Sequence, residues 1–179
     1  MKSLRDFANS SGAAVIWLTG LPGSGKSTLA ERVCNELKKR QKKCENFDGD
    51  IIRAAFPLTG FSEQERKLHI CRIGFFAAIL ERNDVFVVVS LVSPYEEARA
   101  QARSYAKRFI EVYLSTPLAV CEKRDPKGMY AKARKGLIQH FTGIDDPYEP
   151  PTHPEITIDT SVTSIEDSVR KIIERIDAE

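Results

Sequence analysis

The chain has 179 residues, of which 42% are hydrophobic, so it can bury the core of one domain without disulfides or a structural metal. Its 27 Lys and Arg residues nearly balance its 25 Asp and Glu residues, and a net charge of +2 disfavours a nucleic-acid partner. Its four cysteines form no CxxC pair, and no apolar run is long enough to span a bilayer, which favours a reduced cytoplasmic protein without a membrane partner.

The first predicted elements are two strands separated by a helix. Residues 15–18 form an apolar run that stops before Gly20 and predicts a buried strand. Residues 27–40 predict a helix, because Leu29, Val33 and Leu37 recur at helical spacing. A second, short strand is predicted at 45–47.

A long helix and a strongly apolar strand are predicted next. Ser62 and Glu65 form a capping-box pattern, which predicts a helix from this point to about residue 82. The β-branched run at 85–89 predicts a central strand of the sheet. We expect the following side chains of the helix to face inward: Leu68, Ile73, Phe76, Ile79 and Leu80.

The last elements complete an alternation of strands and helices. A strand is predicted at 109–114, followed by a helix capped by Thr116 with Pro117 at its first position. The final strand is predicted at 156–158 and the final helix at 164–176. This pattern predicts an α/β P-loop NTPase fold, with a mainly parallel five-stranded sheet, helices on both faces and an inserted lid.

Residues 125–154 break the pattern, because they are rich in Lys, Arg, Gly and Pro and show little periodicity. A segment of this kind inside a compact domain is usually a functional lid or a disordered loop. We therefore expect one domain over residues 1–179, with a mobile lid at about 125–154 that orders when substrates bind.

The motif GLPGSGKST at 20–28 predicts a phosphate-binding loop. It lies between a predicted strand and a predicted helix, which is the context that this motif requires. Its glycines let backbone N–H groups point at phosphates, its lysine contacts the β- and γ-phosphates, and its serine ligates Mg²⁺. The residues predicted to bind ATP here are Gly20, Gly23, Ser24, Gly25, Lys26, Ser27 and Thr28.

A second carboxylate is predicted to come from Asp48 or Asp50. Many P-loop proteins take it from a later apolar strand, but the strand at 85–89 continues into Ser90-Leu91-Val92-Ser93, without an acid. Asp48-Gly49-Asp50 follows the second strand, and strand ends on this side of a parallel sheet converge on the nucleotide. These acids could hold Mg²⁺ through water or accept a proton from an attacking hydroxyl, and an ordinary Asp-Gly turn is the alternative.

Several longer stretches resemble the adenylylsulfate kinase family. The most discriminating are the DPKGMYAKAR run (125–134) and HFTGIDDPYEPP (140–151), and the others are FDGDIIR (47–53), GFSEQERKLHICRIG (60–74) and LVSPYEEAR (91–99). The resemblance covers about residues 15 to 160. It implies transfer of the ATP γ-phosphate to the ribose 3′-hydroxyl of adenosine 5′-phosphosulfate, with Mg²⁺, in sulfate assimilation.

The resemblance also implies roles for individual residues. Lys26, Asp48, Asp50 and Ser93 would be catalytic, and the serine that matches Ser93 is described as a phosphoserine intermediate in some members, although direct in-line transfer suffices. Ser27 and Asp48 would serve the metal, and Arg124 would lie near the ATP base. Phe61 and Phe141 would sandwich the acceptor's adenine, and Arg66 would hold its phosphosulfate. The full implied acceptor site comprises Asp48, Gly49, Asp50, Arg53, Phe61, Arg66, His69, Val92, Ser93, Lys127, His140 and Phe141.

Three positions depart from the family pattern. His69 and Ile51 stand where asparagines are usual, and Glu96 stands where the run is commonly basic. These departures leave open a related P-loop kinase for another small anionic acceptor, and a regulatory module without transfer activity is a third alternative. A homodimer and a fusion or association with a sulfate adenylyltransferase are the expected protein partners.

Overall fold

A computed structural model of the chain describes residues 12–56 and 60–178. The predicted strands and helices lie within these ranges, whereas the expected single domain over residues 1–179 extends beyond them. No helix in the described ranges is long and apolar enough to cross a membrane.

Five parallel strands form the sheet, as predicted. They are β1 (Val15–Gly20), β2 (Cys44–Asp48), β3 (Phe86–Ser90), β4 (Phe109–Leu114) and β5 (Ile156–Ile158). Their order is β2-β3-β1-β4-β5, so the strand predicted to be central, β3, is an interior strand and β1 is the middle one. All five carboxyl ends therefore lie at one edge of the sheet.

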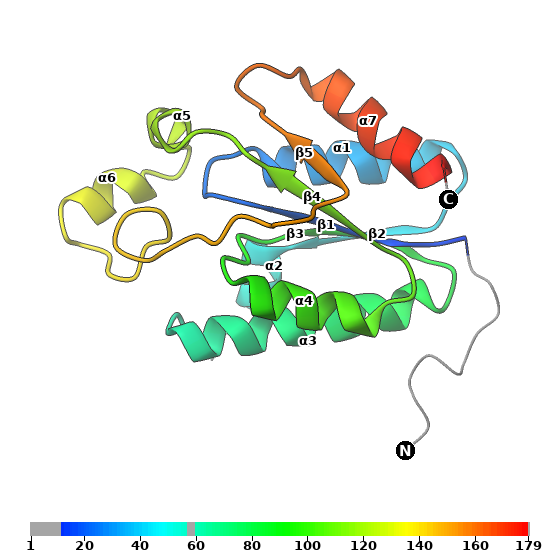
Figure 1. Ribbon diagram of the computed structural model, residues 1–179, viewed down its shortest axis with the longest axis horizontal. Coiled ribbons are helices and arrows are strands. Elements are labelled where there is room, and N and C mark those ends of the chain that lie inside the picture. The colour runs from blue at the N-terminus through cyan, green and yellow to red at the C-terminus, as the bar shows by residue number, and fades with distance from the viewer. Residues whose placement is uncertain (1–11, 57–59, 179) are drawn as a thin grey trace.

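Helices cover both faces of the sheet (Figure 1). α1 (Lys26–Lys39) and α7 (Ile165–Asp177) pack on one face, where Ile16 and Leu18 belong to the core. α3 (Glu63–Glu81) and α4 (Glu96–Tyr105) pack on the other, against Val15 and Trp17. The alternation of β1 side chains between two apolar cores confirms the prediction of a strand buried on both faces.

Three short helices lie at the carboxyl edge of the sheet: α2 (Gly49–Ala55), α5 (Leu118–Arg124) and α6 (Met129–Arg134). α2, α4 and α6 were not predicted. α6 gives part of the 125–154 segment regular structure, and Tyr130, Ala133 and Phe141 of this segment form a small apolar core with Cys121 of α5. The expectation of a segment without regular structure is therefore wrong for its first part.

The predicted capping box at the start of α3 is present, with Ser62 and Glu65 bonded reciprocally. Its predicted inner face is partly wrong, because Leu68 is 50% exposed and Phe76 is 45% exposed. α3 instead turns small residues inward, and this lets it approach α4 closely. A prediction that places only the large apolar residues of a helix in the core therefore misplaces the inner face of α3.

Gly74 marks the closest approach of α3 and α4. A Cβ at this position would lie 2.5 Å from the Cβ of Ala102. We expect Gly74→Ala to lower the free energy of unfolding by about 1–3 kcal/mol, because overpacking forces the helices apart. Chemical denaturation measures the change, and the loss should be smaller in an Ala102→Gly background. Equal losses in both backgrounds would contradict this packing.

Thr116 does not cap the helix that follows it, contrary to prediction. The N-cap of α5 is Pro117, and the Thr116 hydroxyl instead contacts the Thr160 hydroxyl at 2.8 Å. This contact ties the end of β4 to the loop after β5.

Candidate active site

The phosphate-binding loop follows β1 and leads directly into α1. Gly23 and Gly25 have φ of 76° and 97°, a left-handed conformation that favours glycine. A Cβ on Gly23 would also lie 2.9 Å from the carbonyl oxygen of Cys121. Gly25 is the N-cap of α1, so the amides of the first helical turn remain available to an anion.

Lys26 is buried under this loop. Its Nζ donates to the carbonyl oxygens of Gly20 and Leu21 at 2.9 and 2.8 Å. Burial lowers the pKa of Lys26 to about 8, although the charges of Asp48 and Asp50 act in the opposite direction. Lys26, which is predicted to contact the ATP phosphates, therefore lies within the electrostatic influence of the predicted carboxylates Asp48 and Asp50.

The lowered pKa of Lys26 has a consequence for stability without nucleotide. Between the folded pKa of about 8 and the unfolded value of 10.5, the unfolded chain binds more protons than the folded one. The free energy of unfolding should therefore gain up to about 3 kcal/mol from this group as the pH rises through that window. Lys26→Met should lack this gain, so the difference between wild type and variant should change with pH. Parallel pH profiles of the two proteins would contradict it.

Asp48 joins the donor loop to the second strand. Its carboxylate accepts a hydrogen bond from the Ser90 hydroxyl at 3.1 Å and lies beside the Ser27 side chain. It is also the N-cap of α2 and accepts from the amide of Asp50 at 2.9 Å. Partial burial raises the pKa of Asp48, but these hydrogen bonds outweigh it, and the pKa lies below its usual value. Asp48 is thus an ionised carboxylate beside Ser27.

Asp50, Arg53 and Phe61 lie along the segment that follows. Asp50 forms an ion pair with Lys127, which reaches it from the 125–154 segment. The Arg53 guanidinium lies 4.5 Å from the centre of the Phe61 ring, and its Nη1 donates to Gly60. Phe61 is 60% exposed, so an aromatic face is available to a ligand at this edge.

Arg66 connects α3 to the 140–146 loop. Its guanidinium donates to the carbonyl oxygens of Phe61 and His140 and, at 2.8 Å, to the Thr142 hydroxyl. It also pairs with the Asp146 carboxylate at 3.2 Å. The buried Arg66 side chain thus donates hydrogen bonds to three protein groups and forms an ion pair with a fourth.

His69 lies one turn further along α3 and is buried. Its Nε2 has no hydrogen-bond partner among the described residues. Burial, followed by the charges of Arg53 and Arg72, lowers the pKa of His69 to about 4. The residue that replaces the family's asparagine is therefore a neutral imidazole at neutral pH.

Ser93 belongs to a buried polar network that reaches Trp17 and Thr19 of β1 and, through Thr19, the hydroxyl of Tyr148. Its Oγ accepts from the Trp17 indole at 3.1 Å and donates to the Thr19 hydroxyl at 2.9 Å. Thr19, the residue before the phosphate loop, also donates to the carbonyl oxygen of Val92 and contacts the Tyr148 hydroxyl. The Ser93 hydroxyl is held between two protein groups, which suits positioning of the loop better than nucleophilic attack.

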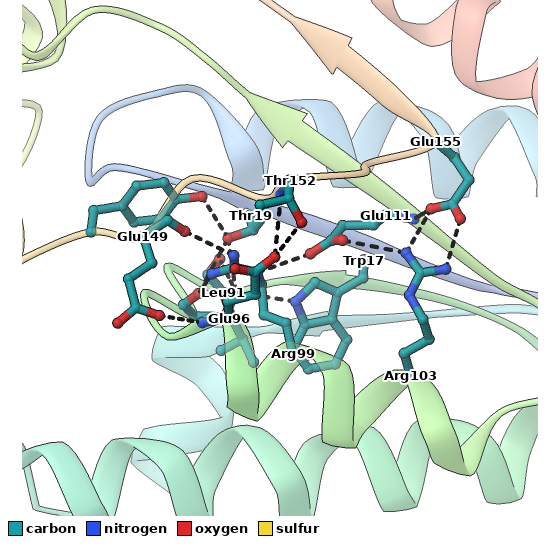
Figure 2. A network of polar contacts seen from close by, with 12 residues as sticks. Trp17, Thr19, Leu91, Glu96, Arg99, Arg103, Glu111, Glu149, Thr152 and Glu155 are labelled. Atoms are coloured by element: carbon teal, nitrogen blue, oxygen red, sulfur yellow. Dashed lines mark hydrogen bonds and ion pairs between the residues drawn. The ribbon is translucent and has the colours of Figure 1, made fainter.

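Arg99 anchors the same network from α4 (Figure 2). Its guanidinium donates to the carbonyl oxygens of Ser93 and Glu149 and to the carboxylate of Glu111, at 2.7, 2.8 and 2.9 Å. Arg103 continues the network to Glu155 at 2.7 Å. The chain between residues 148 and 155 is therefore fastened to α4 and the sheet.

Glu96 also has its partners in this fastened segment. Its carboxylate accepts from the amide and the hydroxyl of Thr152, the latter at 2.6 Å, while its own amide donates to Glu149. As the first residue of α4, it also carries its charge at the favourable end of the helix. The acid that departed from the family pattern thus has a structural partner in the 148–155 segment.

Three further predicted residues, Arg124, His140 and Phe141, lie at or within the 125–154 segment. Arg124 donates to the hydroxyl and the carbonyl oxygen of Thr160, both at 2.8 Å. Phe141 is 8% exposed and meets the Tyr130 ring edge-to-face, so it is far less open than Phe61. His140 is exposed and contacts Asp146 through Nδ1 at 3.2 Å.

A cavity of about 620 Å³ lies between residues 113–118 and the 143–150 segment. Its lining includes Leu21 but neither Lys26 nor Asp48. The side chains predicted for phosphate transfer therefore lie outside this cavity, at the carboxyl ends of β1, β2 and β3.

Four residues of this site were not predicted: Thr19, Arg99, Asp146 and Tyr148. Tyr148 and Asp146 lie within a motif that was recognised, but the motif did not indicate their partners. Thr19 precedes the phosphate loop by one residue, and no sequence signal linked it to Ser93.

Comparison with known proteins identifies what this arrangement resembles. A profile of the Adenylylsulphate kinase family matches residues 12–159. The adenylyl-sulfate kinase of Gloeothece citriformis (strain PCC 7424) is 47% identical over 163 residues, which cover 90% of this chain and 93% of that protein.

Two solved structures extend the comparison. The Mycobacterium tuberculosis APS kinase in complex with AMPPNP and APS has a TM-score of 0.88 and 38% identity, covering 92% of this chain and 98% of that one. The hexameric APS kinase from Thiobacillus denitrificans has a TM-score of 0.70 and 27% identity, covering 93% of this chain and 29% of that longer one.

Proposed function

The chain belongs to the adenylylsulfate kinase family, and from this membership we propose how its residues divide the work of phosphorylating adenylyl sulfate with ATP. The reaction gives 3′-phosphoadenylyl sulfate and ADP and serves sulfate assimilation. The observation that carries the division is the position of the Asp48 carboxylate beside Ser27 and Lys26, because it joins the donor loop to the acceptor segment.

The phosphate loop binds the donor. Backbone amides of the loop and of the first turn of α1 receive the phosphates, and Lys26 exchanges its loop carbonyl partners for phosphate oxygens. An anion beside Lys26 offsets the burial that lowers its pKa, so nucleotide binding keeps the lysine charged. Arg124 lies at the outer side of the loop, where it would contact the ATP base.

Ser27 and Asp48 fit a magnesium ion. Both offer oxygen atoms, which Mg²⁺ prefers, and Ser27 lies close enough to Asp48 to lower the pKa of its carboxyl. Within the described residues no group of three or more His, Cys, Asp or Glu side chains forms a metal site, which agrees with an ion that takes its other ligands from phosphates and water. When bound, Mg²⁺ would neutralise charge on the β- and γ-phosphates.

The acceptor side is formed by the segment from Asp48 to His69 and by the lid. Phe61 offers its exposed face to the adenine, with Phe141 at the opposite side of the site, and Arg53 and Arg66 face the phosphosulfate. Gly49, His69, Val92, Lys127 and His140 line the rest of the acceptor site. Asp50 orients Lys127 through their ion pair.

Asp48 accepts the proton of the attacking 3′-hydroxyl. Its low pKa makes it a weak base, and a weak base is sufficient because the transition state of phosphoryl transfer is loose. The oxygen–phosphorus bond to the acceptor forms as the bond between the β–γ bridging oxygen and the γ-phosphorus breaks. Ser93 positions the neighbouring loop and takes no phosphate.

A panel of acceptors tests the assignment. ADP release would be measured with adenylyl sulfate, other nucleotides and sugars at equal concentrations. We expect turnover at micromolar adenylyl sulfate to exceed that with every other acceptor. No turnover with adenylyl sulfate, under conditions where ATP binding is demonstrated, would contradict the assignment, and faster turnover of another anionic acceptor would support the alternative kinase.

Self-association is part of the proposal. Large apolar side chains on α2 and α3 are exposed, including Ile51, Leu68 and Phe76 at 69%, 50% and 45%. The relative from Thiobacillus denitrificans is hexameric. Light scattering at several protein concentrations should give more than one chain per particle, and a particle of one chain at all of them would contradict it. We further propose a cytoplasmic location and association with a sulfate adenylyltransferase, which would supply the acceptor.

A further inference from the structure

We propose that Asp146 competes with the acceptor's phosphosulfate for Arg66, and so lowers the affinity of the site for adenylyl sulfate. This inference rests on the proposed function, in which Arg66 faces the phosphosulfate. It assigns to Asp146 the role of an internal anion that the acceptor displaces.

Arg66 is engaged by four groups of the protein itself. The carbonyl oxygens of Phe61 and His140 and the Thr142 hydroxyl accept from it, and the Asp146 carboxylate completes the set at 3.2 Å from Nη2. Only Asp146 among these partners carries a charge. The phosphosulfate must therefore meet an arginine whose charge is matched by a carboxylate.

The pair between Arg66 and Asp146 is shielded from solvent. The Arg66 side chain is 9% exposed and that of Asp146 is 17% exposed, whereas the pair between Lys127 and Asp50 is 63% and 69% exposed. Water and salt screen charges that are shielded from solvent much less than they screen exposed charges. A second anion beside Arg66 would thus be repelled by Asp146 as well as attracted by the arginine.

Asp146 lies in a loop that is braced by its own hydrogen bonds. Asp145 accepts from the amides of His140 and Phe141 at 2.7 and 2.6 Å, and residue Thr142 pairs with Asp146 through the backbone. The loop from 140 to 146 therefore holds its own shape and contacts Arg66 from one side. The same loop supplies the His140 carbonyl oxygen and the Thr142 hydroxyl to Arg66, and His140 Nδ1 contacts the second oxygen of Asp146 at 3.2 Å.

A positioning role for Asp146 predicts the opposite result. If the carboxylate only oriented Arg66 for the substrate, removing its charge would weaken acceptor binding. If Asp146 competes with the acceptor, removing its charge strengthens binding. The sign of the change in KM for adenylyl sulfate separates these two roles.

The test compares Asp146→Asn with Asp145→Asn in the full chain. Asparagine keeps the shape of the side chain and a hydrogen-bond acceptor while removing the charge. We expect Asp146→Asn to lower KM for adenylyl sulfate by about three- to tenfold and to leave KM for ATP within about twofold. Asp145→Asn, which weakens the amide caps but lies outside the contact with Arg66, should lower Tm without lowering KM for adenylyl sulfate.

The outcomes separate this inference from the proposed function. An unchanged or raised KM for adenylyl sulfate in Asp146→Asn, with wild-type Tm, would overturn the inference and leave the proposed function standing. The absence of turnover in wild type would overturn both. Asp146→Ser gives a second measurement if the asparagine variant does not fold, with the same expected direction. Equal decreases in KM for both substrates, or in both asparagine variants, would also overturn it.

Discussion

Replacing Asp48 with asparagine is expected to lower kcat by about 100- to 10,000-fold, the range typical of a removed general base. The asparagine oxygen can still accept from the amide of Asp50, so the N-cap of α2 is retained and the fold should be unaffected. ATP binding should persist, because the phosphate loop is unchanged. A coupled assay for ADP gives kcat, and a fluorescence titration gives the affinity for ATP.

Asp50→Asn is the matched control for this prediction. It removes the second carboxylate, which is exposed and paired with Lys127, while Asp48 keeps its contact with Ser27. We expect a smaller loss of kcat and a rise in KM for the acceptor. A larger loss in Asp50→Asn than in Asp48→Asn would transfer the role of proton acceptor to Asp50. A wild-type rate in both variants would refute carboxylate participation.

Lys26→Met should lower kcat by about 100- to 1,000-fold, because it removes a fixed positive charge at the phosphates where charge develops. Methionine keeps most of the apolar stem of the buried lysine. The substitution removes the hydrogen bonds from Lys26 to the carbonyl oxygens of Gly20 and Leu21. Because both partners belong to the phosphate loop, effects on the acceptor site should be small. Steady-state kinetics should locate the loss in kcat and in KM for ATP.

Lys123→Met supplies the control, since this residue lies on α5 and is exposed. Its kinetic constants should match those of wild type. If Lys26→Met keeps more than about a tenth of the wild-type kcat, Lys26 does not contribute to stabilising the transition state as proposed.

Local patterns were enough to predict the sheet. The apolar runs that became β1, β3 and β4 lie within one or two residues of their predicted bounds, because a parallel sheet buried on both faces needs continuous apolar strands. Short helices were harder, since α2 and α6 have seven and six residues and offer too few turns for a periodic pattern. The face of α3 was misjudged because contact with α4 selects small residues.

Motifs located the two halves of the site, but they did not indicate how the residues pair. The glycine-rich loop and the Asp-Gly-Asp run lie at the carboxyl ends of β1 and β2, where their motifs and the strand ends predicted them. The contact of Arg66 with Asp146 joins residues 80 apart in the sequence, and its existence depends on how the 140–146 loop packs. The contact of Glu96 with Thr152 likewise joins distant residues, and it gives a structural reason for an acid that departs from the family pattern.

Direct transfer of the terminal phosphate to adenylyl sulfate is the central claim, and a single-turnover experiment with γ-labelled ATP tests it most directly. Enzyme in excess over labelled ATP would be mixed with adenylyl sulfate, and the label would be followed in ATP, in protein and in nucleotide product. We expect the label to pass into 3′-phosphoadenylyl sulfate without appearing on the protein. Label retained in ATP while the acceptor is bound, or label that accumulates on Ser93 before product forms, would contradict the account.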